Sequence, residues 1–141
     1  MMEPLTLDIT STELKDRLRE GIVTQEHSEF SWSIELTIEG YSLSCEFESA
    51  SQEEAIIYDL EVDDEIQNNG IGTAIIEVIE SFIKEQTEAH ILYADIGADE
   101  GATEHVLENK CGFDIVGVVQ KETVGEVVQA EKIIRRSFIR I

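Results

Sequence analysis

Cysteine and proline are scarce in this chain of 141 residues, and long apolar runs are missing. Two cysteines, Cys45 and Cys111, and one proline, Pro4, argue against a disulfide-stabilised secreted domain and against proline-rich linkers. We expect both thiols to be reduced, which favours the cytoplasm. No uninterrupted apolar stretch approaches the roughly 18 residues of a membrane-spanning helix. The N-terminus also lacks the basic and apolar regions of a secretory signal.

Basic residues are few as well: 10 Lys and Arg stand against 31 Asp and Glu, a formal net charge of −21. Such a surface repels nucleic acid and anionic membranes, so we expect neither as a partner. The apolar periodicity argues against a disordered acidic protein. Two explanations stay open: an acidic face that attracts polyamines or basic peptides, and an origin in a halophile, where molar salt reduces the screening length to about 3 Å. The second is favoured, because the acidic residues are spread along the chain.

The pattern of apolar residues predicts a single domain over residues 1–141, long enough to bury a core. Apolar and polar residues alternate over residues 29–38 and 41–47 around a tight Glu39-Gly40 turn, which predicts a β-hairpin. Thr10 or Ser11 is expected to cap a helix that Gly21 ends. Further helices are expected at residues 73–88 and 102–110, and further strands at 5–9, 55–62, 91–96, 113–120 and 127–138. The result is an α+β fold, a mostly antiparallel mixed sheet with helices on both faces.

The segment with the most functional information lies between an expected strand and an expected helix, and reads Gln67-Asn68-Asn69-Gly70-Ile71-Gly72-Thr73-Ala74. A strand that enters a helix through two glycines leaves backbone N–H groups open at the helix N-terminus, where the helix dipole helps them to bind phosphate oxygens. Glycine also lets the anion approach the backbone closely. A dinucleotide loop would need a third glycine at Ile75, and a P-loop would need a Lys after a glycine. Neither fits.

The pattern Q-x-x-G-x-G after a strand resembles the R/Q-x-x-G-x-G/A signature of the GNAT (GCN5-related N-acetyltransferase) family. A second segment, Cys111-Gly112-Phe113-Asp114-Ile115-Val116-Gly117, looks like that family's L-Y-E-K-x-G-F-x-x-x-G, with Gly112 in a left-handed conformation after a helix. The resemblance covers about residues 55 to 120. It implies the same α+β sheet and direct transfer of acetyl from acetyl-coenzyme A to a primary amine, with no metal. The residues that it implies for the coenzyme are Leu60, Val62, Gln67, Asn68, Asn69, Gly70, Ile71, Gly72, Thr73 and Ala74.

Transfer to an amine requires a base, because a protonated amine has no lone pair. Glu61 is our first candidate and Asp95 our second; Asp59 and Glu61 are expected to share a face of their strand, since side chains alternate with period two. Each can equally be an ordinary solvated carboxylate. The family's usual general acid, a Tyr, falls at Glu108 in this chain. Glu108 is either a protonated acid with a raised pKa or an exposed helix glutamate.

Other residues receive weaker assignments. Tyr58 and Tyr93 are alternative phenols that we expect in the core, and the three histidines have no spacing typical of a metal site. Arg135, Arg136 and Arg140 are expected to be solvated, unless they meet an acidic subunit in a homodimer or the coenzyme phosphates.

The acidic surface favours a cationic small molecule or a protein amine as acceptor. Two other functions stay open. A non-catalytic acyl-coenzyme A sensor or scaffold is favoured by the missing Tyr and by a loop that offers Asn68 and Asn69 where Arg or Lys is usual. An unrelated acidic interaction domain would make the glycine turn fortuitous.

Overall fold

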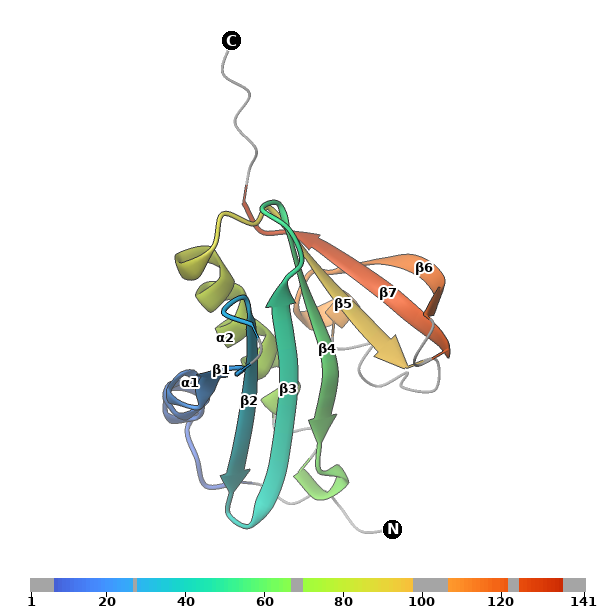
Figure 1. Ribbon diagram of the computed structural model, residues 1–141. Coiled ribbons are helices and arrows are strands. Elements are labelled where there is room, and N and C mark those ends of the chain that lie inside the picture. Colours follow the sequence, from blue (N-terminus) through green and yellow to red (C-terminus); the bar gives the residue numbers. More distant parts are fainter. Residues whose placement is uncertain (1–6, 27, 67–69, 98–106, 122–124, 136–141) are drawn as a thin grey trace.

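The computed structural model of the protein describes residues 7–26, 28–66, 70–97, 107–121 and 125–135 (Figure 1). Its centre is a seven-stranded sheet with the strand order β1-β2-β3-β4-β5-β7-β6. Only β4 and β5 pair in parallel, so the expected mostly antiparallel mixed sheet and the α+β class are confirmed. The strands are β1 Ile22–Thr24, β2 Ser31–Ile38, β3 Tyr41–Ser49, β4 Glu54–Val62, β5 Ile91–Gly97, β6 Asp114–Lys121 and β7 Gly125–Ile133.

The expected hairpin is formed by β2 and β3, with Ile38 paired to Tyr41 across a two-residue turn. Both turn residues have positive φ, 51° at Glu39 and 87° at Gly40. Two-residue hairpin turns of this kind match the right-handed twist of the strands and favour glycine. Local sequence was therefore sufficient to place this element.

Helix α1, Ser11–Glu20, also forms as expected. The Thr10 side chain accepts a hydrogen bond from the Glu13 N–H at 3.1 Å, which satisfies one of the free donors of the first turn. Gly21 follows the helix, and Leu14 and Leu18 are its buried residues. Their spacing of four places both side chains on the face that contacts the core.

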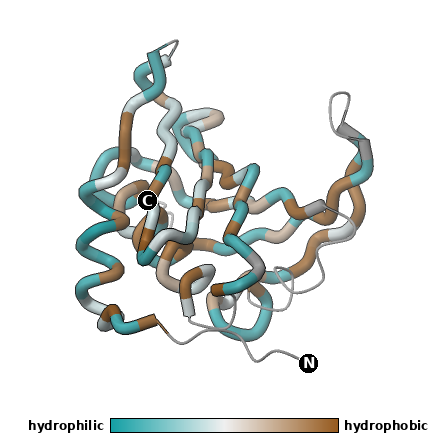
Figure 2. The backbone as a smooth tube through the Cα atoms, turned by 90° about the horizontal axis from the view of Figure 1, so that it is seen from below, coloured by the Kyte–Doolittle hydropathy of each residue, from teal (hydrophilic) through white to brown (hydrophobic). Residues whose placement is uncertain are grey.

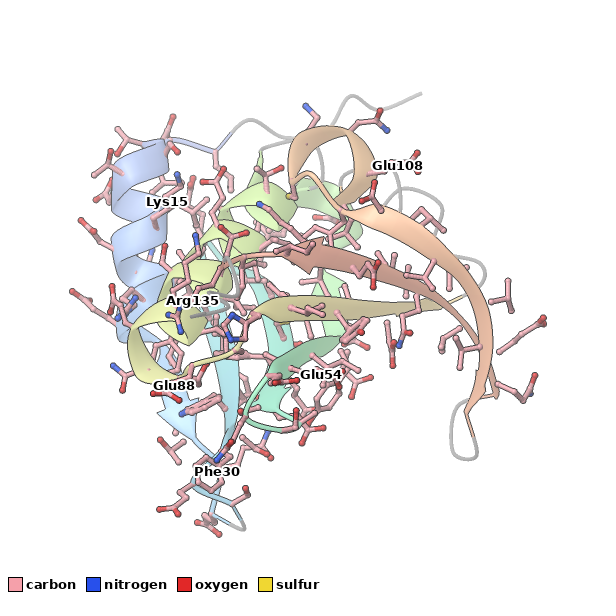
Figure 3. The ribbon with its side chains drawn as sticks, turned by 90° about the horizontal axis from the view of Figure 1, so that it is seen from above. Lys15, Phe30, Glu54, Glu88, Glu108 and Arg135 are labelled. Atoms are coloured by element: carbon pink, nitrogen blue, oxygen red, sulfur yellow. The ribbon has the colours of Figure 1, made fainter. Side chains whose placement is uncertain are left out.

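Helix α2, Ile71–Gln86, begins two residues before the expected start and ends two residues before the expected end. It packs against α1, and the two are joined by ion pairs from Lys15 to Glu77 and from Arg19 to Glu85. The described helical residues, including 107–110, lie on one face of the sheet, where we had expected helices on both faces (Figures 1 and 3). Among the described residues no helix covers the other face of β2 to β5, and we call it the open face.

The core lies between the helices and the sheet. Hydrophobic and hydrophilic residues alternate along the strands in Figure 2, so that one face of each strand supplies the core. Phe47 and Leu92 of the sheet are fully buried, as are Ile75 and Ile79 of α2. No helix among the described residues is long and apolar enough to cross a membrane.

Three expectations about strands need correction. Residues 7–9 are not in a strand, and residues 5 and 6 lie outside the described residues. Strand β1 was missed because three residues are too few to show a periodic pattern; it forms by pairing with β2, Ile22 opposite Ile34. Strand β7 ends at Ile133, and residues 136–141 lie outside the described part.

Candidate functional site

Strands β4 and β5 separate halfway along their length (Figure 1). Their parallel pairing runs from Glu54 opposite Ile91 to Ile57 opposite Ala94. Beyond that point β4 continues to Val62 alongside β3, and β5 continues to Gly97 alongside β7. We call the opening between residues 58–62 and 95–97 the fork. Strand edges without a partner strand carry backbone N–H and C=O groups that can bind an extended ligand.

A β-bulge in β4 decides which side chains border the fork. Glu46 pairs with Tyr58, but Ser44 pairs with Glu61, so β4 holds one extra residue there. Asp59 has a φ of 51°, a conformation that interrupts the regular alternation of side chains. Before the bulge Ala55 and Ile57 are buried, and after it Leu60 and Val62 pack against the core instead.

The bulge corrects one step of the sequence analysis. Strict period two would have placed Asp59 and Glu61 on the face of Ile57, which is the core face. Both are exposed instead. Glu61 lies on the open face beside Ser44, so its carboxylate reaches solvent because of the bulge and not because of the alternation that we had assumed.

The N-terminus of α2 follows β4 after the short helix η1, Asp64–Ile66. Gly70 precedes the helix with a left-handed φ of 73°, and a Cβ there would meet no heavy atom within 4 Å. The first intrahelical bond runs from the Ala74 N–H to the Gly70 carbonyl, at 3.0 Å. Within the described residues, the N–H groups of Ile71, Gly72 and Thr73 have no hydrogen-bond partner. Together with the helix dipole, these donors can hold an anion.

Residues 67–69, which include three of the expected coenzyme contacts, lie outside the described residues. Ile71 and Ala74 are buried, so only their backbone groups can face a ligand. The Thr73 side chain lies beside the Cys111 thiol. Burial raises the pKa of Cys111, and the Glu77 carboxylate adds to this, whereas Lys132 and Thr73 act in the opposite direction. Cys111 is thus a packed thiol against the first turn of α2.

The second motif lies beside the first turn of α2, where Cys111 is next to Thr73. Gly112 has the expected left-handed φ, 77°, and is the second residue after the helical residues 107–110. The Phe113 N–H then bonds to the Leu107 carbonyl at 3.0 Å, which closes the helix end. Leu107 and Phe113 are both buried.

A groove of about 490 Å³ lies over the ends of β2, β3 and β4. Its charged members are Glu35 and Glu61, and its hydroxyl groups come from Thr37, Ser42 and Ser44. Leu36 and Leu43 complete the lining. Because Glu61 also belongs to the arm of β4 that borders the fork, its carboxylate lies between the groove and the fork.

The other candidate acids occupy different positions. Asp95 begins the β5 arm of the fork and accepts a hydrogen bond from the Gln129 side chain at 3.0 Å. Glu108 is exposed on the helical residues 107–110 (Figure 3). The structure therefore brings Glu61 and Asp95 to the two arms of one opening and leaves Glu108 in solvent.

Tyr58 and Tyr93 are partly exposed on the open face, where we had expected core residues. Burial is the largest cause that raises the pKa of Tyr58 to about 12, and Glu48 and Glu46 add to it. Sequence reasoning also missed the groove around Glu35. The polar residues at alternate positions of the hairpin were the available signal, since such positions share a face.

A family model for the acetyltransferase (GNAT) family matches residues 6–113. The chain belongs to this family. The family model spans the fork, the glycine turn at α2 and the start of the second motif, Cys111-Gly112-Phe113.

Solved structures share the GNAT fold at low sequence identity. The ribosomal-protein-S18-alanine N-acetyltransferase from Escherichia coli is 17% identical, with a TM-score of 0.62 and coverage of 94% of this chain and 95% of that one. The spermidine/spermine N-acetyltransferase SpeG from Vibrio cholerae is 14% identical, with a TM-score of 0.60 and coverage of 77% and 68%.

An acetyl transferase from Salmonella typhimurium that modifies the N-terminal serine of ribosomal protein L7/L12 is 12% identical, with a TM-score of 0.59; the match covers 74% of this chain and 64% of that protein's length. No curated protein sequence matches the chain significantly. At these identities the structural matches establish the fold alone.

Proposed function

We propose that this GNAT protein is an N-acetyltransferase that moves an acetyl group from acetyl-coenzyme A to a primary amine by direct transfer. The observation that carries the proposal is the fork between β4 and β5, next in the chain to a helix N-terminus whose first N–H groups have no partner among the described residues. A ligand with an anionic end and an extended arm matches both features. Acetyl-coenzyme A has a diphosphate and a pantetheine arm, and its thioester supplies the acetyl group.

The proposed coenzyme site uses backbone groups more than side chains. The diphosphate would be held by N–H groups of residues 67–74, with Gly70 and Gly72 allowing close approach. The pantetheine arm would pair with the free backbone edge of β4 at Leu60 and Val62. Side chains of Asn68 and Asn69 would add amide donors but no positive charge.

In direct transfer the amine nitrogen attacks the thioester carbonyl carbon, the carbon–sulfur bond breaks, and coenzyme A leaves as a thiolate. Glu61 is the proposed base, because its carboxylate is exposed between the groove and the fork and can accept the amine proton directly or through a water molecule. Asp95 is the second candidate, with Gln129 orienting its carboxylate from β7.

The proton that the thiolate needs has a different source from the family's usual Tyr. Glu108 stands in that place and is exposed, so solvent can serve as the donor. Tyr58 is the phenol of the β4 arm, and with a pKa raised to about 12 it stays protonated at neutral pH.

Binding of acetyl-coenzyme A, followed by isothermal titration calorimetry, tests the site. Gly70→Glu places a side chain and a negative charge at the open helix N-terminus, and we expect it to abolish binding. Gly40→Glu is the matched control, because Gly40 also has a positive φ, 87°, and also has nothing within 4 Å of its Cβ position. Both variants carry the same backbone strain and the same added charge. Equal affinity in the two variants would refute the placement of the coenzyme.

A second candidate function is a non-catalytic acyl-coenzyme A sensor or scaffold. It is favoured by the exposed Glu108 in place of a phenol and by the absence of Lys and Arg between Gln67 and Ala74. A thiol-release assay across a panel of amines separates the two functions. Release above the hydrolysis background, reduced about 10²-fold or more in Glu61→Gln, supports the enzyme. Tight coenzyme binding without release supports the sensor.

A further inference from the structure

Most of the basic side chains whose contacts are described lie on the helix side of the sheet. Lys15 and Arg19 of α1 form ion pairs with Glu77 and Glu85 of α2, and Lys132 of β7 forms one with Glu80 of α2 at 2.6 Å. All ion pairs between described residues involve a carboxylate of α2. Figure 3 shows Lys15 and Arg135 among the helices, whereas Glu54 lies on the other side of the strands.

The open face has the opposite composition. The fully described strands β2, β3, β4 and β5 contain no Lys or Arg. Their outward positions carry carboxylates from the groove to the other end of β4. We call this surface the acidic face and define it by Glu35, Glu46, Glu48, Glu54 and Glu61, with Glu131 of the neighbouring strand β7.

The carboxylates of this face contribute to raising the pKa of two tyrosines, Tyr58 and Tyr93. Burial comes first among the causes that raise the pKa of Tyr58 and of Tyr93. Glu48 adds to the shift of Tyr58, and Glu54 and Glu131 add to that of Tyr93. Both rings are partly exposed, and an aromatic ring beside carboxylates is a favourable contact for a Lys or Arg side chain.

We propose that the acidic face is the docking surface for an extended basic peptide segment, which brings the acceptor amine to Glu61. The inference rests on the proposed acetyl transfer at the fork and names its substrate class: an amino group presented by a lysine- or arginine-rich polypeptide. The segment lies across the open face with its basic side chains over the carboxylates. Its amino end occupies the groove beside Glu61.

The spacing of the carboxylates matches an extended peptide. Glu46 and Glu48 are two residues apart on β3, so their side chains leave the sheet about 7 Å apart. Alternate side chains of an extended peptide repeat at the same distance. From Glu61 to Glu54 the acidic face extends along β4 for about 20 Å. A small polyamine would fill the groove and leave the far carboxylates without a contact.

Peptide binding is measurable without any chemistry. The probe is a peptide of about ten residues with a free amino terminus, Lys at alternate positions and a fluorescent group at its other end, and the readout is anisotropy in low salt. The test variant is the double substitution Glu48→Gln and Glu54→Gln, far from the groove and the fork along β3 and β4. Glutamine keeps the oxygen that accepts from the Ser31 hydroxyl at position 48.

The matched control is Glu20→Gln with Glu88→Gln, which removes the same charge from two exposed positions, the last residue of α1 and the second residue after α2. Each exposed carboxylate contributes at most about fivefold to an ionic contact, so we expect the test variant to lose roughly tenfold in peptide affinity and the control less than about twofold. Calorimetry with acetyl-coenzyme A should give the same affinity for both double variants.

Three results would overturn the proposal: no binding of the peptide, equal losses of peptide affinity in the test and control variants, or a spermidine affinity that falls in the test variant as much as the peptide affinity does. The last result would assign the face to small cations. The docking surface and the acetyl transfer can be refuted independently of each other. A chain that binds the peptide through Glu48 and Glu54 but acetylates no amine refutes the transferase and keeps the docking surface, whereas acetylation of small amines without peptide discrimination refutes the docking surface alone.

Discussion

Arg135 is expected to stabilise the protein by capping the C-terminal end of α2, and Arg135→Ala removes that cap. Its guanidinium donates to the Thr87 carbonyl oxygen at 3.0 Å and also to the carbonyl oxygen of Lys84. The last carbonyl groups of a helix have no partner within the helix and carry the negative end of its dipole. A single cation therefore satisfies two acceptors of a helix that packs against both α1 and the sheet.

The loss of stability expected for Arg135→Ala is limited by the partial exposure of these hydrogen bonds. A hydrogen bond to a charged group contributes about 1.5–3 kcal/mol when buried, but water replaces much of it at a partly exposed site. The interaction of the cation with the helix dipole adds about 0.3–1 kcal/mol. We expect Arg135→Ala to lower the free energy of unfolding by about 1–2 kcal/mol, which corresponds to about 3–8 °C in Tm for a domain of this size.

Thermal and denaturant unfolding, followed by circular dichroism in one buffer, measure the effect. Arg17→Ala is the control, because among the described residues the Arg17 guanidinium donates to a single carbonyl, that of Thr37 at 3.0 Å, and that contact is exposed. Arg135→Lys keeps the charge without the planar donor pair and should fall between wild type and Arg135→Ala. The reasoning is refuted if Arg135→Ala is no more destabilising than Arg17→Ala.

Three further predictions concern the cap of α1, the phenol of the fork and the net charge. Thr10→Ala should destabilise the protein by about 1 kcal/mol in denaturant unfolding, because the Glu13 N–H loses its acceptor; Thr10→Ser should not, and equal losses would contradict the assignment of the cap. The pKa of Tyr58 is raised from 10.0 to about 12, so the folded state favours the protonated phenol; the resulting stability is fully present below pH 10 and is lost as the pH rises to about 12. Tyr58→Phe should remove the part of the stability loss between pH 10 and about 12 that comes from Tyr58. Identical profiles of unfolding free energy against pH for variant and wild type would exclude this contribution. With a net charge of −21, the protein should have a higher Tm in molar potassium chloride than in low salt, and a melt that does not respond to salt would count against a halophilic origin.

Elements defined by neighbouring residues were predictable from the sequence. The Glu39-Gly40 turn, the Thr10 cap and the glycine before α2 all depend on conformations or hydrogen bonds within a few residues. The same holds for Gly112, whose expected left-handed conformation after a helix is observed. Strand β1 was not predictable, because Ile22–Thr24 becomes a strand only by pairing with β2.

In the candidate site, too, features that depend on contacts between distant parts of the chain could not be predicted from the sequence. The sequence Tyr58-Asp59-Leu60-Glu61-Val62 looks like an uninterrupted strand, and nothing in it marks Asp59 for a positive φ. Glu61 was selected as the base for a reason that the bulge invalidates, yet the bulge is what exposes it. Arg135 was expected to be solvated because its partners, Thr87 and Lys84, are 48 and 51 residues away in the chain. Contacts over such separations need the folded arrangement.

The extra residue in β4 shifts the alternation of side chains by one, so that odd-numbered positions face the core before it and even-numbered positions after it. A chain that kept all its residues but paired with β3 without the bulge would direct the carboxylate of Glu61 at the hydrophobic interior, and the leucine and valine on either side of it at water. Deleting Asp59 would instead leave an unbroken two-residue repeat in which Glu61 still faces solvent. Asp59 is therefore the one residue of this segment that the alternation does not need, and the place of the proposed proton acceptor depends on the ladder accommodating it.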